Sequence, residues 1–155
     1  MMVSPETFYI NGATSEERNW AAELLAGSEP WITLGTTLEQ CRKVCWNPEY
    51  LVCIAHLNDI ACGLIILHPS GLASSPYIKS VAVADAYRNL GVGSRMIAFA
   101  ENHFRNNSKH IFLCVSSFNK LAGKFYEGLG YRRVGEFKDY VIDGADEILF
   151  HKSLR

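Results

Sequence analysis

The chain has 155 residues, of which 48% are hydrophobic and 20% charged, and its formal net charge is -1. A chain of this length and composition is not disordered and can bury one sizeable core, so we expect a single domain over residues 1–155. The near-zero charge gives no reason to expect nucleic-acid binding, and the longest apolar run, Ile60–Leu67, is far shorter than the ~18 residues of a membrane span.

The first fifty residues carry signals for one strand and two helices. A short strand is expected at Phe8–Ile10. Residues Thr14–Glu17 form a capping box, which predicts a helix that ends near Leu25. A second capping box at Thr36–Glu39 predicts a helix that ends near Trp46, shortly before a proline.

The next residues carry the signals of a β-hairpin. Two apolar runs, Leu51–His56 and Ala61–Leu67, flank Asn58-Asp59, which is typical of a tight turn between strands. The segment Leu67–Gly71 contains a proline and a glycine and predicts a break before the following strand. Two further strands are expected at the C-terminal end, Arg132–Tyr140 and Glu147–Lys152, joined across Asp143-Gly144.

Two glycines connect a strand to a helix in the middle of the chain. The expected strand is Tyr77–Val83 and the expected helix is Ser94–Phe104, and Arg88, Gly91 and Gly93 lie between them. Glycine lets the backbone approach a ligand closely, and the free N–H groups of such a turn converge on an anion at the helix N-terminus. The sequence lacks the third glycine of the dinucleotide-binding fingerprint and the lysine of a P-loop, so it predicts a different phosphate ligand.

A second motif runs from Asn119 to Tyr131 and reads Asn-x-x-Ala-x-x-Phe-Tyr-x-x-x-Gly-Tyr. It follows Ile111–Val115, an apolar run expected to be a buried strand. Asn119 is suited to cap the N-terminus of a helix over Lys120–Leu129, and Gly130 is suited to the position after its end.

These two motifs, in this order and at this separation, resemble those of the GNAT superfamily of acetyl-CoA-dependent N-acetyltransferases. The resemblance implies an α/β fold of the α+β type: a central mixed, mostly antiparallel twisted sheet, flanked by helices. Two splayed parallel strands would form the acetyl-CoA cleft, and Asn119 would contact the pantetheine arm of this acetyl donor. The residues that the resemblance implies for cofactor binding are Val81, Ala82, Val83, Arg88, Asn89, Leu90, Gly91, Val92, Gly93, Ser94, Asn119, Ala122, Lys124 and Tyr126.

The implied chemistry is acyl transfer from a thioester to a neutral amine, which needs donors for the oxyanion and a proton for the departing thiolate. The resemblance places the oxyanion donor among the backbone N–H groups of Val81–Val83 and makes Tyr126 the general acid. A phenol keeps its proton at neutral pH and can give it to a thiolate. We expect Phe125, next to it, to supply the core-facing bulk. Transfer is expected to be direct, because Cys114 has no evident base that would activate it as a nucleophile.

The acceptor side is less clearly marked. Tyr77 stands where many members of the superfamily carry a glutamate, so we expect the amine to lose its proton through water rather than to a contacting carboxylate. Glu29 is a candidate base, and the carboxylates of the hairpin from Glu136 to Glu147, especially Asp139, are alternatives. Trp31 is expected to line the acceptor pocket. The amine remains open: a small metabolite, a polyamine, an amino acid, an antibiotic or a protein N-terminus.

Two functions from different classes are therefore compatible with the sequence. The first is an acetyl-CoA:amine N-acetyltransferase acting on a small molecule or a protein N-terminus. The alternative is a non-catalytic acyl-CoA-binding or sensing module of the same fold. The presence of both Asn119 and Tyr126 favours the enzyme, since a binding module does not need the phenol.

The remaining residues give the expected surroundings of the protein. The five cysteines lack Cys-x-x-Cys spacing and the five histidines are scattered singly, so no metal is expected. No signal peptide is evident, and the cysteines inside apolar strands suggest a reduced, cytoplasmic protein. We expect a monomer or homodimer whose partners are acetyl-CoA and an amine, with no nucleic acid and no membrane.

Overall fold

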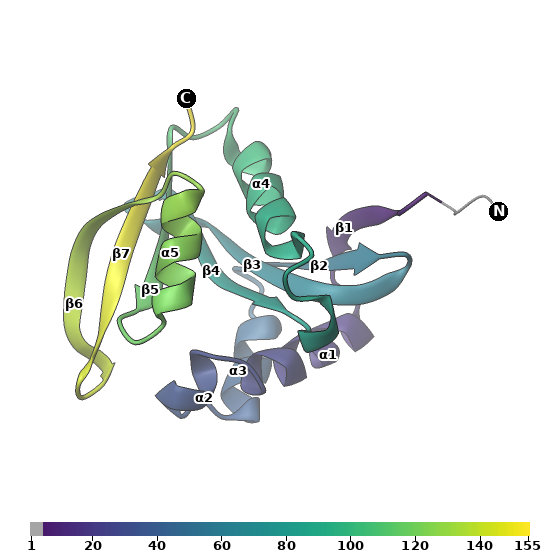
Figure 1. Ribbon diagram of the computed structural model, residues 1–155, viewed down its shortest axis with the longest axis horizontal. Coiled ribbons are helices and arrows are strands. Elements are labelled where there is room, and N and C mark those ends of the chain that lie inside the picture. Colours follow the sequence, from purple (N-terminus) through teal and green to yellow (C-terminus); the bar gives the residue numbers. More distant parts are fainter. Residues whose placement is uncertain (1–4) are drawn as a thin grey trace.

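The computed structural model describes residues 5–155, which form one seven-stranded sheet in the order β1-β2-β3-β4-β5-β7-β6 (Figure 1). Neighbouring strands are antiparallel except for β4 and β5, which are parallel. The strands are β1 (Phe8–Gly12), β2 (Leu51–Leu57), β3 (Ile60–Leu72), β4 (Ser75–Val83), β5 (His110–Ser116), β6 (Arg132–Ile142) and β7 (Ala145–Ser153). The helices are α1 (Ser15–Ala26), α2 (Trp31–Leu34), α3 (Leu38–Cys45), α4 (Val92–Phe104) and α5 (Lys120–Gly128), with a short 3-10 turn at Asp85–Tyr87. The predicted fold class is confirmed.

Helices cover both faces of the sheet: α1, α2 and α3 lie on one side, and α4 and α5 on the other (Figure 1). Strand β2 is buried on both faces, because successive side chains of a strand point to opposite sides. Its Cys53 and Ala55 belong to the core under α4 and α5, whereas Val52 and Ile54 belong to the core under α1 and α3. This two-sided burial explains why the central strands read as continuous apolar runs.

The predicted capping boxes are present, the second one residue later than expected. Thr14 and Glu17 cap α1 reciprocally, as predicted. On α3 the box joins Thr37 and Gln40, not Thr36 and Glu39. The reason is that the backbone N–H of Thr36 closes the turn after α2 by donating to the carbonyl of Trp31 at 3.0 Å, a one-turn helix that the sequence did not reveal. Thr37 is therefore the first residue free to cap.

The break predicted over Leu67–Gly71 is wrong, because β3 continues to Leu72. Pro69 and Gly71 lie in a segment where the pairing register with β4 shifts between His68 and Leu72, as in a β-bulge. A proline is tolerated there because it removes no regular ladder hydrogen bond. The strand then reverses through Ala73-Ser74, both at positive φ.

An ion pair on the buried face fixes α4 to the sheet. The Glu101 carboxylate on α4 lies 3.0 Å from the Lys152 ammonium on β7 and accepts a hydrogen bond from the Tyr131 hydroxyl at 2.9 Å. Both Glu101 and Tyr131 are buried. Because Glu101 lies near the C-terminal end of α4, these contacts fix that end of the helix to β7.

The five cysteines are free thiols, and four of them are buried. Among residues 5–155 there is no cluster of three or more histidine, cysteine or acidic side chains arranged to hold a metal ion. None of the helices within residues 5–155 is both long and apolar enough to span a membrane.

Candidate active site

The parallel strands β4 and β5 pair at only two positions and then diverge. The paired residues are Tyr77 with Phe112 and Ile78 with Leu113. Beyond Ile78 the edge of β4 that faces β5 is no longer covered by a neighbouring strand. A cavity of about 350 Å³ lies at this divergence, lined by residues of β4 to β7, of α3 and α5, and of α1 and the segment that connects it to α3. The splayed strands that the sequence predicted are confirmed.

Two backbone N–H groups of β4 point into this opening. The N–H of Ala84 donates to the carbonyl of Cys62 on β3 at 2.8 Å. Because residues along a strand alternate in the neighbour they face, the N–H groups of Val81 and Val83 point away from β3, toward β5. The Val83 carbonyl, which faces the same way, accepts a hydrogen bond from Nε of Arg88 at 3.2 Å. The predicted oxyanion donors thus lie on the open edge of β4.

The glycine loop begins α4 in the way the sequence predicts. Gly91 is the N-cap residue at a φ of 80°, without a side-chain cap, so the first N–H groups of the helix are open to a ligand. Gly93 has a different role: a Cβ there would lie 3.3 Å from Cζ of Phe125, so this glycine allows α4 and α5 to approach each other. Arg88 forms an exposed ion pair with Asp85 at 3.1 Å.

Helix α5 lines the cavity through its N-cap residue Asn119 and through Ala122 and Tyr126. The Asn119 side chain caps the helix by accepting from the N–H of Ala122 at 3.4 Å. Tyr126 is only 9% exposed, and burial raises the pKa of its phenol above the ordinary value. Phe125 packs against the core, as expected, but Tyr126 is the more buried of the two and also belongs to the core.

The Tyr126 hydroxyl nevertheless reaches the cavity. Within residues 5–155 the only fully buried side-chain polar atom without a hydrogen-bond partner is Nδ1 of His56. The Tyr126 hydroxyl makes no hydrogen bond to the protein either, so it would be a second such atom if it were fully buried. It is therefore accessible, and because Tyr126 lines the cavity, we infer that the hydroxyl opens to the cavity. A buried phenol with a free, cavity-facing hydroxyl is suited to donate a proton to a bound molecule.

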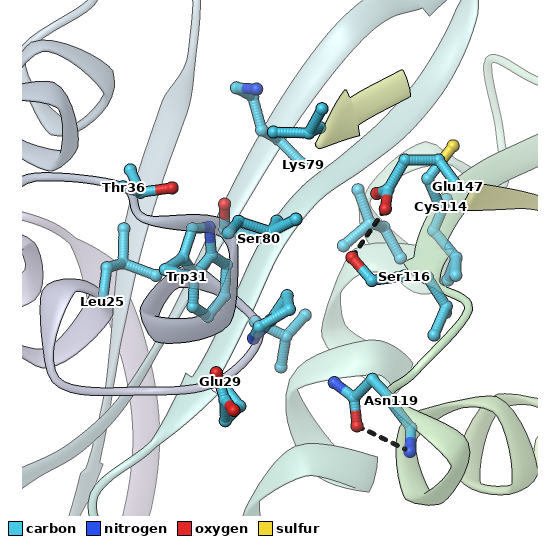
Figure 2. A pocket seen from close by; sticks show the side chains of 18 of the residues that line it. Leu25, Glu29, Trp31, Thr36, Lys79, Ser80, Cys114, Ser116, Asn119 and Glu147 are labelled. Atoms are coloured by element: carbon cyan, nitrogen blue, oxygen red, sulfur yellow. Dashed lines mark hydrogen bonds between the residues drawn. The ribbon is translucent and has the colours of Figure 1, made fainter. Parts of the chain in front are cut away.

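The helical wall of the cavity contains two of the predicted acceptor residues, Trp31 and Glu29 (Figure 2). The Glu29 carboxylate accepts hydrogen bonds from the backbone N–H of Thr33 at 2.8 Å and from its hydroxyl at 2.5 Å. These hydrogen bonds lower the pKa of Glu29. Since a carboxylate with a lowered pKa and two occupied acceptor sites is a weak base, its position supports acceptor contact better than proton abstraction.

The opposite wall contains Tyr77 but not Asp139. Burial raises the pKa of the Tyr77 phenol, with a further increase from the neighbouring Cys114 thiol. Tyr77 therefore stays protonated and can orient a water molecule. Asp139 is not among the residues that line the cavity: its carboxylate accepts the N–H of Gly144 at 2.6 Å and closes the β6–β7 turn.

Sequence reasoning did not single out the most prominent carboxylate of the cavity, Glu147 on β7. Ser116 on β5 donates its hydroxyl hydrogen to this carboxylate at 2.6 Å (Figure 2). Burial raises the pKa of Glu147, and no cation among residues 5–155 pairs with it within 4 Å. Glu147 is the last residue of the hairpin from Glu136 to Glu147, which was predicted to offer a base. Only its pairing opposite Ser116 brings it to the cavity.

The remaining predicted cofactor residues lie outside the cavity wall, along the connection from β4 to α5. They are Ala82, Val83, Arg88, Asn89, Leu90, Gly91, Val92, Gly93, Ser94 and Lys124. A second basic residue of this region, Arg95, is held elsewhere: its guanidinium pairs with Glu6 at 2.9 Å and lies 3.8 Å over the ring of Phe8. Of β4, the cavity is lined as far as Val81, and the strand continues from there to Val83, ahead of the 3-10 turn and the glycine loop.

A mixed sheet with one splayed parallel pair, a glycine-containing loop between β4 and α4, and a cavity beside α5 agree with the GNAT fold. Residues 16–131 match the model of the acetyltransferase (GNAT) family, and the chain belongs to this family.

Individual relatives agree with this assignment. The uncharacterized N-acetyltransferase MJ1530 of Methanocaldococcus jannaschii is 38% identical over 78 residues, covering 49% of this chain and 50% of that protein. N-alpha-acetyltransferase 50 of Danio rerio is 30% identical over 108 residues, covering 66% of this chain and 64% of that protein. The chain thus spans half to two thirds of the length of these relatives. A GNAT acetyltransferase from Elizabethkingia anophelis, solved with acetyl-CoA bound, superposes with a TM-score of 0.76 at 18% identity, covering 94% of this chain and 97% of that one.

Proposed function

We propose that this protein transfers the acetyl group of acetyl-CoA to a primary amine, by direct attack in a ternary complex. The observation that carries the proposal is the free hydroxyl of Tyr126, which opens to the cavity where β4 and β5 diverge. Family membership and the acetyl-CoA bound in the Elizabethkingia anophelis structure support the choice of acetyl donor. The decisive experiment is a screen of amines with acetyl-CoA that follows release of free thiol.

The cofactor is proposed to lie along the open edge of β4. Its pyrophosphate would bind the N–H groups at the start of α4, with Arg88 and Lys124 near the phosphates, and its pantetheine arm would pass between β4 and β5 beside Asn119. The thioester carbonyl would then face the N–H groups of Val81 and Val83. These donors already point into the opening, so they need no rearrangement to stabilise the oxyanion.

The proposed transfer proceeds by attack of the amine nitrogen on the thioester carbonyl, which forms a C–N bond and places negative charge on the carbonyl oxygen. The C–S bond then breaks, and the departing thiolate takes the proton of Tyr126. The proton lost by the amine passes through water, ordered by Tyr77, to a carboxylate. Glu147 suits this role better than Glu29 because burial raises its pKa, whereas hydrogen bonds lower that of Glu29.

The acceptor class follows less directly. One relative is named an N-alpha-acetyltransferase, which makes a protein or peptide N-terminus a reasonable first class of amine to test. The alternative proposal is an acyl-CoA-binding module without catalysis, favoured by Tyr77 standing where many relatives carry glutamate. Saturable CoA binding with no thiol release across the amine screen would favour the binding module.

Replacing Gly91 by Val is expected to weaken acetyl-CoA binding about tenfold. A β-branched residue is strained at a φ of 80°, and of order 1–3 kcal/mol of strain would distort the loop whose N–H groups hold the pyrophosphate. The measurement is the Kd by titration calorimetry on the folded variant.

Gly144→Val is the matched control. Gly144 has a φ of 82° and, like Gly91, no atom within 4 Å of an added Cβ, but it lies in the β6–β7 turn. Both variants should lose similar stability, while only Gly91→Val loses affinity for acetyl-CoA. An equal or absent loss of affinity in the two variants contradicts the proposed position of the pyrophosphate.

Replacing Cys114 by Ala is expected to change kcat less than about threefold. Burial raises the pKa of this thiol, so the nucleophilic thiolate is scarce at neutral pH. Initial-rate kinetics should show intersecting rather than parallel double-reciprocal lines. Parallel lines, or an acetyl group trapped on Cys114 by mass spectrometry, would instead establish a covalent intermediate.

A further inference from the structure

We propose that the acceptor carries an anionic group close to its amine, with the ammonium received by Glu147 and the anion by Lys79. This inference rests on the proposed acetyl transfer and names the charge of its acceptor. The two side chains extend from β4 and β7, the strands on either side of β5, and line the same cavity. Figure 2 shows Lys79 and Glu147 on opposite sides of the opening.

The Lys79 ammonium has no partner of opposite charge. No carboxylate among residues 5–155 lies within 4 Å of it, and Nζ lies 5.6 Å from the centre of the Tyr50 ring. The residue is exposed to the cavity, yet partial loss of surrounding water lowers its pKa. An anion bound beside this ammonium would restore the favourable interaction that the missing water supplied.

The position of Lys79 distinguishes the acceptor from the cofactor. Lys79 precedes Val81 by two residues, about 7 Å along the strand, so it can reach a group attached to the attacking amine. The pyrophosphate loop lies beyond the opposite end of β4, past the 3-10 turn at Asp85–Tyr87. The phosphates of CoA are therefore not the anion for which Lys79 is placed.

Glu147 provides the complementary charge. Its carboxylate accepts one hydrogen bond, from Ser116, and has further acceptor capacity on its two oxygens. The Cys114 thiol lies between the two charges: Glu147 raises its pKa and Lys79 lowers it, although burial is the larger cause of its raised value. Glu147 and Lys79 do not pair with each other within 4 Å, which leaves a ligand with both charges room to bind between them.

Matched acceptors test this inference by thiol release with acetyl-CoA. L-alanine against L-alaninamide tests an anion on the amino acid itself, and the peptide amides Glu-Ala-Ala and Gln-Ala-Ala test an anion on a peptide N-terminus. In at least one pair the acid should have a kcat/KM about tenfold higher than the neutral compound, which is the size of a charge-assisted contact. The pair that discriminates identifies the source of the anion. An alkyl diamine serves as the acceptor of opposite charge.

Lys79→Met should remove that preference by lowering kcat/KM about tenfold for the acid and less than twofold for the neutral compound, and Lys79→Arg should restore part of it. Lys109→Met, an exposed lysine outside the cavity, is the control expected to change neither. Three results would overturn this inference and leave the proposed transferase activity standing. They are acetylation without preference for an acid, a preference for the diamine, and a loss of kcat/KM in Lys79→Met that is equal for the acid and the neutral compound. Absence of thiol release with every amine contradicts the proposed transferase activity and this inference with it.

Discussion

Replacing Tyr126 by Phe is expected to lower kcat about 100-fold, at the lower end of what loss of a general acid costs. The substitution removes one oxygen atom and leaves the ring, which packs edge-on against Phe125 and Tyr131 in the core. The Tyr126 hydroxyl makes no hydrogen bond within residues 5–155, so the variant leaves no protein group unpaired. Stability and the Kd for acetyl-CoA should therefore change little. The measurements are initial rates, titration calorimetry and thermal unfolding.

Tyr131→Phe is the matched control, because it removes the same atom from the neighbouring ring. The Tyr131 hydroxyl donates to the buried Glu101 carboxylate at 2.9 Å, and losing a hydrogen bond to a charged group costs about 1.5–3 kcal/mol. This variant should have a lower Tm and a nearly normal kcat below that temperature. Tyr126→Phe should instead keep a nearly normal Tm and have a much lower kcat. If Tyr126→Phe keeps full turnover while chemistry is rate-limiting, Tyr126 is a packing residue and not the acid.

Local signals predicted those parts of the fold that depend on neighbours in sequence. The turn at Asn58-Asp59 was recognisable because both residues tolerate positive φ, and they adopt 51° and 66°. The cap of α5 by Asn119 follows from its side-chain oxygen in the same way. The shift of the second capping box by one residue shows where local reasoning ends. Thr36 and Thr37 are chemically equivalent, and only the turn closed by the preceding helix decides between them.

The cavity was harder to predict because strands distant in sequence build it. Glu147 reaches the site through its register opposite Ser116, 31 positions earlier, and no local pattern fixes such a pairing. Asp139, by contrast, lies in the segment of β6 where the register with β7 shifts, and its carboxylate accepts the N–H of Gly144 in the turn. Lys79 likewise resembles any solvent-facing lysine of a strand until the divergence of β4 and β5 is known.

Replacing Glu147 by Gln is expected to lower kcat/KM about 100- to 1000-fold near neutral pH, the lower part of the range for loss of a general base. Glutamine keeps an oxygen that accepts the hydrogen bond of Ser116, so the geometry of β5 and β7 is preserved while the charge is removed. It can neither accept the amine proton nor attract an ammonium group. The pH profile of kcat/KM, measured for both proteins, should lose in the variant the rise that reflects ionisation of Glu147.

The same substitution, Glu147→Gln, should raise the stability of the fold above about neutral pH although it lowers kcat/KM. Burial raises the folded-state pKa of Glu147, so its ionised form destabilises the native state once the pH exceeds the unfolded pKa, and this effect grows until the pH passes the folded value. Glu147→Gln should therefore match the wild-type Tm at about pH 3, well below the unfolded pKa, where the carboxyl is protonated in both states, and exceed it at about pH 8.

A group that weakens the fold and yet improves turnover is retained for its chemistry, because packing alone would favour the neutral amide. Asp146→Asn, on the neighbouring residue, separates this effect from a general response to charge on β7. Burial raises the Glu147 pKa, whereas a backbone hydrogen bond from Asp139 and the nearby Lys138 lower that of Asp146. Asp146→Asn should therefore lose stability at pH 8 rather than gain it. If Glu147→Gln instead lowers the Tm at pH 8 and leaves kcat/KM unchanged, the carboxylate is structural, and the amine proton must leave by bulk water.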